Sequence, residues 1–293
     1  MSIQYNDRMV WPKGRLKAFT LSYDDGVSQD LRLIKLLKKY GVACTFNLNP
    51  GLFGREGRVS ANKKEVSHNK FSISEVSKVY KGFEIAAHGD VHCCMRGMDT
   101  ARCINEIMPS RQQLEQLLHH PVKGFAYAFG AYDDRVLEAM RACGMSYGRT
   151  IESTHCFDIP QDFLQWHPTC HHGDKDLLSL TEQFLSDVMY FNMDSPSKLF
   201  YVWGHSYEFD QDDNWDVMEE FLQKVSGHGD VWYATNGEIY RYVEAFRRLV
   251  FTADGRYVYN PSAIPVCIRG MFSDGYLEIE PGEVATVLPE IEM

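Results

Sequence analysis

The chain has 293 residues, of which 44% are hydrophobic and 24% charged, values close to those of average globular proteins, so intrinsic disorder and coiled coil are excluded. Its 30 Lys and Arg stand against 40 Asp and Glu, a net charge of -10 with no dense basic block, so neither nucleic acid nor an anionic membrane is an expected partner. The length accommodates one α/β barrel of about 250 residues together with a small additional unit.

The N-terminal segment has no apolar run typical of a secretory signal, and no window of the sequence reaches the ~18 apolar residues of a membrane-spanning helix. We therefore expect a cytoplasmic protein. The eight cysteines include no CxxC pair, and most lie inside apolar stretches, where cysteine behaves as a small buried hydrophobe. This pattern predicts reduced thiols and no structural zinc ribbon.

Strand and helix patterns alternate along most of the chain. Short apolar runs predict strands at 16–22, 42–47, 83–87, 124–128, 145–148, 199–204 and 231–234. Apolar residues at helical spacing predict helices at 28–40, 100–118, 134–143, 177–190, 215–225 and 238–249. This alternation is typical of a parallel sheet with crossover helices, an α/β fold.

Two regions depart from the alternation. Residues 50–69 are rich in Gly, Lys, Asn and Ser and are long enough to be a functional loop. From residue 251 onward, short β-like runs are separated by turn dipeptides, which predicts a small β-rich appendage. We therefore divide the chain into a barrel at 1–250 and an appendage at 251–293. These two regions are where we expect a substrate or a partner subunit to be selected.

Chemically active residue types follow three of the predicted strands. Asp24 and Asp25 follow the first strand, His88 and His92 follow the strand at 83–87, and His205 follows the strand at 199–204. The carboxyl ends of barrel strands are where α/β barrels place their active sites. Taken singly, Asp-Asp-Gly is also typical of a turn, and a histidine is often a packed residue. Two histidines at i and i+4 project the same way if their segment begins a helical turn.

Together these residues suggest a metal-assisted hydrolase. One carboxylate and two imidazoles with open positions form a catalytic rather than a structural metal set. A divalent ion lowers the pKa of its bound water towards ~7 and polarises a carbonyl oxygen. The second carboxylate then takes the proton from that water, and a histidine across the site protonates the leaving group.

The order of these motifs resembles the polysaccharide deacetylases of carbohydrate esterase family 4, the NodB-type domain, over residues 17–250. The resemblance implies a distorted (β/α) barrel of seven or eight strands that removes an acetyl group from an N-acetylated or O-acetylated sugar. It also implies a zinc ion, with cobalt or nickel as substitutes. Position by position, it implies a base, Asp24, an acid, His205, and three metal ligands, Asp25, His88 and His92.

The chain departs from this family in the Arg-x-Pro-Tyr segment, where it reads Phe125-Ala126-Tyr127-Ala128-Phe129-Gly130. The arginine that holds the base aspartate in the family is replaced by Ala126. Phe129 still offers its backbone N–H to an oxyanion hole, because that donor needs no particular side chain. Arg149 is a candidate replacement for the arginine, and a solvated surface arginine is an equal alternative. The aspartate-tryptophan motif that tunes the acid histidine in the family is not evident. These departures indicate a divergent branch.

Further candidates lie near the same strand ends. Trp203 and Glu208 flank His205 and suit sugar binding, with packing over the barrel mouth as the alternative. Asn236 follows the last strand and either contacts substrate or belongs to the N-cap of the final helix. The sequence Cys170-His171-His172 is either a second metal cluster or a polar loop at the barrel rim.

We therefore interpret the chain as a metal-dependent hydrolase that removes acetyl from an acetylated sugar or polysaccharide, cleaving an amide or an acetyl ester. The expected partner is the acetylated carbohydrate, and the oligomeric state stays open, a homo-oligomer included. One alternative is an allantoinase-type or cyclic-amide hydrolase on the same fold. The other is a non-catalytic carbohydrate-binding protein, which the loss of the family arginine at Ala126 would permit.

Overall fold

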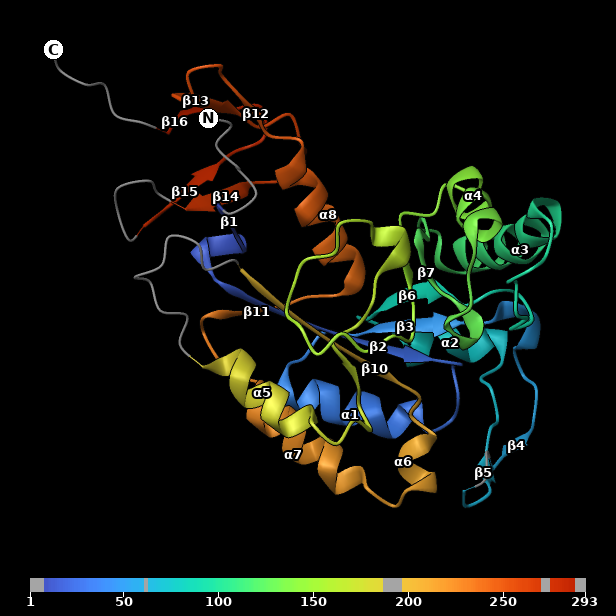
Figure 1. Cartoon of the computed structure of the whole chain (residues 1–293). Coiled ribbons are helices and arrows are strands. Elements are labelled where there is room, and N and C mark those ends of the chain that lie inside the picture. The colour runs from blue at the N-terminus through green and yellow to red at the C-terminus, as the bar shows by residue number, and fades with distance from the viewer. Residues whose placement is uncertain (1–7, 61–62, 187–196, 270–274, 288–293) are drawn as a thin grey trace, which may run out of the picture.

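A computed structural model of the chain describes residues 8–60, 63–186, 197–269 and 275–287 (Figure 1). Its centre is a parallel sheet of eight strands. Seven of them follow one another across the sheet in the order β8 (Tyr147–Arg149), β7 (Gly124–Ala126), β6 (Glu84–Ala87), β3 (Thr45–Leu48), β2 (Lys17–Asp24), β10 (Lys198–Gly204) and β9 (Cys170–His171). The eighth, β11 (Val231–Tyr233), pairs with the first three residues of β2.

The sheet curls into a distorted barrel because one segment joins its two sides. Trp166 forms a parallel bridge with Arg149 of β8, and four residues later β9 pairs with Val202 and Trp203 of β10. Residues 166–171 therefore connect β8 to β10. The predicted fold class, a distorted (β/α) barrel, is confirmed.

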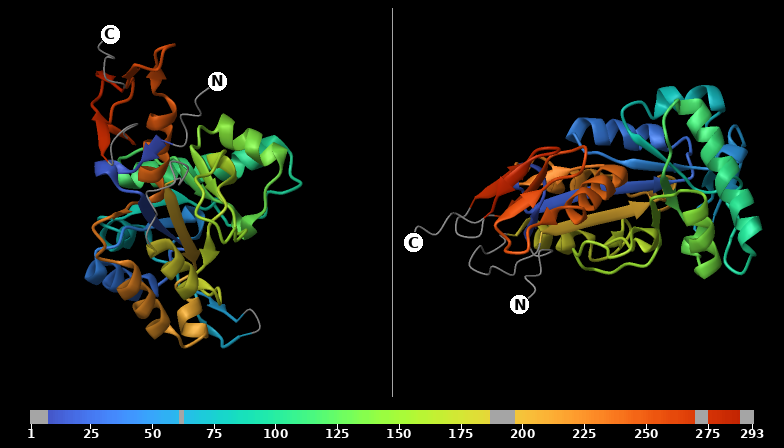
Figure 2. Two further views of the ribbon diagram at one scale, coloured as in Figure 1. Left: turned by 60° about the vertical axis from the view of Figure 1, so that its left-hand side comes forward. Right: turned by 90° about the horizontal axis from the view of Figure 1, so that it is seen from above.

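Helices cover the outside of the barrel (Figures 1 and 2). They are α1 (Asp30–Tyr40), α2 (Ile73–Val79), α3 (Thr100–Leu118), α4 (Asp134–Ala142), α5 (Leu177–Leu185), α6 (Glu208–Gln211), α7 (Trp215–Val225) and α8 (Asn236–Arg247). In α1 the buried residues Leu33, Ile34 and Leu37 recur at helical spacing and face the sheet side. The helix ends at Gly41, whose φ of 66° is a left-handed cap that glycine adopts without strain.

The long helices and the barrel strands agree with the sequence prediction, whereas several other short elements do not appear in it. Helices α3 and α7 have the predicted bounds, and α5 ends at Leu185, so residues 187–190 of the predicted helix lie outside the described residues. Short 3₁₀ turns have no sequence periodicity from which they could be predicted. They are η2 (Pro12–Gly14), η3 (Pro50–Leu52), η4 (Ala128–Gly130) and η5 (Phe163–Gln165). Within the expected functional loop, β4 (Arg58–Val59) and β5 (Val66–Ser67) form a small hairpin.

The appendage consists of two small antiparallel sheets. One contains β12 (Val250–Phe251), β13 (Tyr257–Tyr259) and β16 (Val284–Thr286). The other contains β14 (Val266–Arg269) and β15 (Tyr276–Ile279) together with β1 (Met9–Val10), so N-terminal residues complete a unit that the sequence placed at 251–293 alone.

This appendage packs at the amino ends of the barrel strands. Trp11, next to β1, is fully buried and donates its indole N–H to the carbonyl of Lys198, the first residue of β10. Apolar residues of the appendage such as Val258 and Ile268 share a core cluster with Leu199 of β10. Figure 2 shows the appendage at one end of the long β2 and β10 strands. Asp24 lies at the other end of β2, so we expect substrate selection to depend on the loops there.

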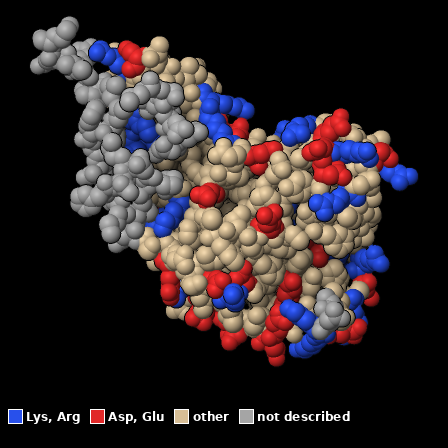
Figure 3. Space-filling model, in the orientation of Figure 1, with Lys and Arg blue, Asp and Glu red and all other residues tan. Residues whose placement is uncertain are grey.

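Charged side chains are spread over the surface without a continuous basic area on the face that Figure 3 shows. No helix among the described residues is long and apolar enough to cross a membrane.

A buried acid ties the start of α1 to two other parts of the barrel. Asp30 is fully buried and accepts hydrogen bonds from the hydroxyls of Tyr80, at 2.6 Å, and Ser206, at 2.5 Å. Burial raises the pKa of Asp30 to about 7, although both hydroxyls oppose this shift. Between about pH 4 and pH 7 the folded protein therefore retains a proton that the unfolded chain has released, so rising pH lowers the free energy of unfolding.

We expect Asp30→Asn to remove this pH dependence. The free energy of unfolding of the wild type relative to the variant should fall from pH 4 to pH 7, by up to about 1.4 kcal/mol per pH unit. Urea unfolding at a series of pH values measures it. The exposed Asp213→Asn is the control and should run parallel to the wild type. Parallel curves for Asp30→Asn would show that Asp30 is ionised throughout.

Candidate active site

The centre of the site is the buried carboxylate of Asp24, the last residue of β2, which is 2% exposed. Asp24 pairs in register with Asn47 of β3, and the Asn47 amide donates to Asp24 Oδ1 at 2.7 Å. The next residue, Asp25, has a φ of 81°, which is unusual for a residue with a side chain. The tight turn therefore places two carboxylates at the carboxyl end of the same strand.

Arg149, at the end of β8, is the charge partner of Asp24. Its side chain is fully buried, and Nη2 forms an ion pair and hydrogen bond with Asp24 Oδ2. The guanidinium carbon lies 4.2 Å from the ring centroid of Trp203, which covers it. Arg149 is therefore neither a solvated surface arginine nor an exposed substrate ligand. It makes the contact to Asp24 that the resemblance implies for an arginine at the position of Ala126.

Burial alone would raise the pKa of Asp24, but the Arg149 charge and the neighbouring imidazoles outweigh it and hold the pKa below its ordinary value. Asp24 is therefore ionised at neutral pH. Its Oδ2 atom lies 3.6 Å from His88 Nε2 and 3.9 Å from His205 Nε2, so one carboxylate oxygen is close to both imidazoles.

His88 and His92 follow β6 in a loop rather than in a helical turn. Gly89 and His92 have φ values of 79° and 59°, and left-handed residues interrupt a helix. The helical-turn geometry considered from the i, i+4 spacing is therefore wrong. The loop nevertheless brings the two rings together, with centroids 4.6 Å apart.

His88 has the features of a metal ligand. Its Nδ1 lies 2.8 Å from the carbonyl of Ala126 and, as an N–H, donates to it, which leaves the lone pair on Nε2. That Nε2 atom is buried and has no hydrogen-bond partner among the described residues. Burial lowers the pKa of His88 to about 4, so the ring is neutral at pH 7. An unpartnered buried lone pair of this kind fits a metal ion.

Asp25 is the third residue of the predicted ligand set. Ligand atoms of Asp25, His88 and His92 all lie within 4.8 Å of one another. The two carboxylate oxygens of Asp25 also contact His68 Nε2, at 3.1 Å, and Lys70 Nζ, at 3.0 Å. Burial opposes ionisation, but these contacts hold the pKa of Asp25 well below its usual range. Each carboxylate oxygen has a second lone pair, so the Asp25 contacts leave room for an ion.

His205, after β10, faces Asp24 with Nε2 and Glu208 with Nδ1, which lies 3.3 Å from Glu208 Oε2. Burial lowers the pKa of His205, but Glu208 raises it more, to about 9. Glu208, the first residue of α6, also contacts His171 and His172, at 3.0 and 3.3 Å. Its carboxylate is thus engaged by imidazoles, where the sequence suggested a contact to sugar.

The remaining predicted substrate contacts differ in exposure. Phe129 has a φ of 59° and is 63% exposed, with its ring 4.8 Å from that of His92. Trp203 is largely buried between Arg149 and His171. Asn236 is fully buried in the barrel, where its amide bonds to Thr20 and Tyr201. The prediction that Asn236 contacts substrate is therefore wrong. Thr235 is the N-cap of α8, because its side chain accepts from Glu238 N–H.

Three contributors were missed from the sequence. Asn47 lies inside an apolar strand, and only the β2–β3 register brings it to Asp24. His68 lies in the segment 50–69 that was expected to be a functional loop, and Lys70 directly follows it. Nothing in the spacing of these two residues links them to Asp25. The hairpin β4–β5 returns the chain to Asp25, and Ser28 N–H donates to the Asn69 carbonyl there.

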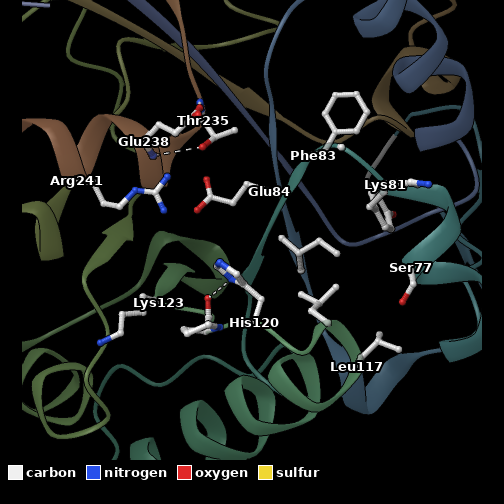
Figure 4. A pocket seen from close by; sticks show the side chains of 15 residues that line it. Ser77, Lys81, Phe83, Glu84, Leu117, His120, Lys123, Thr235, Glu238 and Arg241 are labelled. Carbon is white, nitrogen blue, oxygen red and sulfur yellow. Dashed lines mark hydrogen bonds between the residues drawn. The ribbon is translucent and has the colours of Figure 1, made fainter. Parts of the chain in front are cut away.

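A separate cavity of about 520 Å³ lies near the amino end of β6, between the end of α3 and the start of α8 (Figure 4). Its lining includes Lys81, Glu84, His120, Lys123 and Arg241. None of the residues grouped around Asp24 lines this cavity, so it is distinct from the candidate active site.

Comparisons with known proteins agree with this geometry. Residues 13–148 match the family model for polysaccharide deacetylase. A candidate polysaccharide deacetylase from Mycobacterium smegmatis superposes with a TM-score of 0.57 at 16% identity, covering 82% of this chain and 94% of that one. The Xyl-CE4 domain of a multidomain xylanase from the hindgut metagenome of Trinervitermes trinervoides superposes with a TM-score of 0.51 at 14% identity, covering 78% and 92%.

The Streptococcus pyogenes deacetylase PplD, determined with acetate, aligns at 19% identity with a TM-score of 0.38. That alignment covers 45% of this chain and 55% of that one. No curated protein matches the chain in sequence. At 14–16% identity, the two structures with TM-scores above 0.5 show the fold alone, and the family model matches less than half of the chain. Residues 13–148 are therefore similar to the polysaccharide deacetylase family, and most of the chain shares the fold of the two structures from Mycobacterium smegmatis and the termite-gut xylanase.

Proposed function

We propose that this protein is a metal-dependent hydrolase that removes an acetyl group from an acetylated sugar or polysaccharide. The observation that carries the proposal is the position of Asp24. Its ionised carboxylate lies close to His88, a member of the predicted ligand set Asp25, His88 and His92, and also close to His205. A base, a ligand set and an acid therefore converge at the carboxyl end of the barrel strands.

Asp25, His88 and His92 would hold a zinc, cobalt or nickel ion. When bound, such an ion polarises the substrate carbonyl and acidifies a water molecule. Asp24 Oδ2, held in place by Arg149, accepts the proton of the attacking water. The backbone N–H of Phe129, in the exposed turn beside His92, donates to the oxygen that gains charge. His205 Nε2, 3.9 Å from Asp24 Oδ2, donates a proton to the leaving nitrogen or oxygen.

Arg149 also bears on the alternatives. A non-catalytic carbohydrate-binding protein was permitted by the loss of the family arginine at Ala126, but Arg149 pairs with Asp24 from the neighbouring strand. The charge that keeps the base ionised is thus retained, which favours an enzyme. A cyclic-amide hydrolase would use the same groups, and product analysis separates the two: acetate release identifies the deacetylase, and ring opening without acetate identifies the alternative.

We expect Asp24→Asn to lower kcat for acetate release from acetylated oligosaccharides by about 10²–10⁴-fold, because the amide cannot accept the proton. Bound metal, measured by elemental analysis, should stay as in the wild type. The matched variants Asp25→Asn and His88→Ala should lose activity and the equivalent of metal that this site binds. Full activity in Asp24→Asn would exclude Asp24 as the base, and chelator-resistant activity would exclude the metal mechanism.

We expect Arg149→Met to lower the free energy of unfolding by about 3–5 kcal/mol at pH 7, since it leaves the Asp24 charge buried without its partner. The double variant Asp24→Asn with Arg149→Met should recover part of that loss. As a control, removing the exposed Arg58–Glu65 pair should cost less than about 1 kcal/mol. Denaturant unfolding of the four proteins measures the coupling, and additive losses would contradict the ion pair.

A further inference from the structure

We propose that His171, His172 and Glu208 form a second metal site, beside His205 and separate from the ligand set around Asp25. His171 ends β9, His172 follows it, and Glu208 begins α6. Ligand atoms of these three residues lie within 4.8 Å of one another. None of them belongs to the metal site of the proposed function, so the two proposals can be tested separately.

The crowding at one oxygen is the first observation. Glu208 Oε2 lies 3.0 Å from His171 Nε2, 3.3 Å from His172 Nε2 and 3.3 Å from His205 Nδ1. The backbone N–H of His205 already donates to the same oxygen, at 3.1 Å. A carboxylate oxygen has two lone pairs, so it cannot accept from four nitrogens. Hydrogen bonding therefore accounts for only about two of these four contacts.

The distances fit a shared cation instead. Ligand atoms about 2.0–2.1 Å from a tetrahedral zinc ion lie roughly 3.3 Å from one another. The contacts of Glu208 Oε2 to His171 and His172 are close to this separation. Two imidazoles and one carboxylate are also a donor set that zinc, cobalt and nickel accept, with a position left for water.

The rings are held in place before any ion binds. His172 is buried and stacks between Phe209 and Tyr23, with centroids 4.2 and 5.6 Å away. His172 Nδ1 is buried against Gly204 and has no hydrogen-bond partner among the described residues. No hydrogen bond at Nδ1 therefore fixes which of the two ring nitrogens carries the proton. His171 is partly exposed, and its Nδ1 accepts from Gly173 N–H at 3.1 Å. Metal binding at His171 Nε2 therefore moves the ring proton to Nδ1 and breaks the Gly173 bond, in an exposed turn where the cost is small.

An ion at the second site would hold in place side chains that also border the candidate active site. Because His205 Nδ1 faces Glu208 while Nε2 faces Asp24, the two metal sites would lie on opposite sides of one imidazole. Trp203, which covers Arg149, also contacts His171.

Elemental analysis of the full chain, dialysed with zinc or cobalt and freed of excess metal, tests the proposal. We expect two equivalents in the wild type, one in Glu208→Gln and in His171→Asn, and one in the double variant Asp25→Asn with His88→Ala. The control His155→Ala removes an exposed histidine paired with Asp174 and should retain two. Visible absorption of the cobalt form in the double variant, where only the second site remains, gives a readout independent of activity.

One equivalent in the wild type that persists in Glu208→Gln and His171→Asn would overturn the second site and leave the first intact. One equivalent that persists in the double variant but is lost in Glu208→Gln would support the second site and overturn the first. No bound metal in any protein would overturn both. Circular dichroism of each variant tests whether a lost equivalent reflects unfolding. Because His171 is partly exposed, His171→Asn is the variant that we expect to disturb the fold least.

Discussion

The buried carboxylate of Asp24 is the constraint on which the arrangement of this barrel end depends. An ionised carboxylate that is 2% exposed is costly unless opposite charge and hydrogen-bond donors surround it. Arg149 supplies the charge from β8, and Asn47 supplies a donor from β3. Arg149 is the last residue of β8 and Asn47 lies one residue before the end of β3. The parallel sheet, whose carboxyl ends meet at one edge, therefore allows the compensation.

Asp25 imposes a similar requirement with a different solution. Its left-handed backbone turns the side chain away from the strand, and Lys70 donates both to its carboxylate and to its carbonyl. Lys70 reaches this position because the β4–β5 hairpin returns the chain to the barrel rim. The polar segment at 50–69 therefore has a definite role in the structure, since it delivers the cation that holds Asp25. The appendage, by contrast, packs at the opposite end and contributes apolar contacts there.

The sequence predicted the long elements and the strand ends that carry chemistry, because both depend on local patterns. Helix α3 and the position of Asp24 after β2 follow from periodicity and from a run of apolar residues. The contacts between segments that are distant in the sequence do not follow from such local patterns. Arg149 could be listed as a candidate, but only the β7–β8 register and its burial under Trp203 distinguish it from a surface arginine. For Asn236 the outcome is the opposite. A polar residue after a strand is compatible with a substrate contact from the sequence alone, but in the structure Asn236 is buried at the start of α8.

Arg149 also shows what kind of constraint acts on such a site. Arginine is absent from the β7 position that the family resemblance indicates, yet the guanidinium of Arg149 pairs with Asp24 from the adjacent strand β8. Since Ala126 and Arg149 are register partners in the sheet, the exchange moves the arginine by one strand while its charge stays at the same edge. Ala126 then uses its carbonyl to orient His88. The requirement is therefore a positive charge beside Asp24 and an acceptor beside His88 Nδ1, and more than one sequence position in neighbouring strands satisfies it.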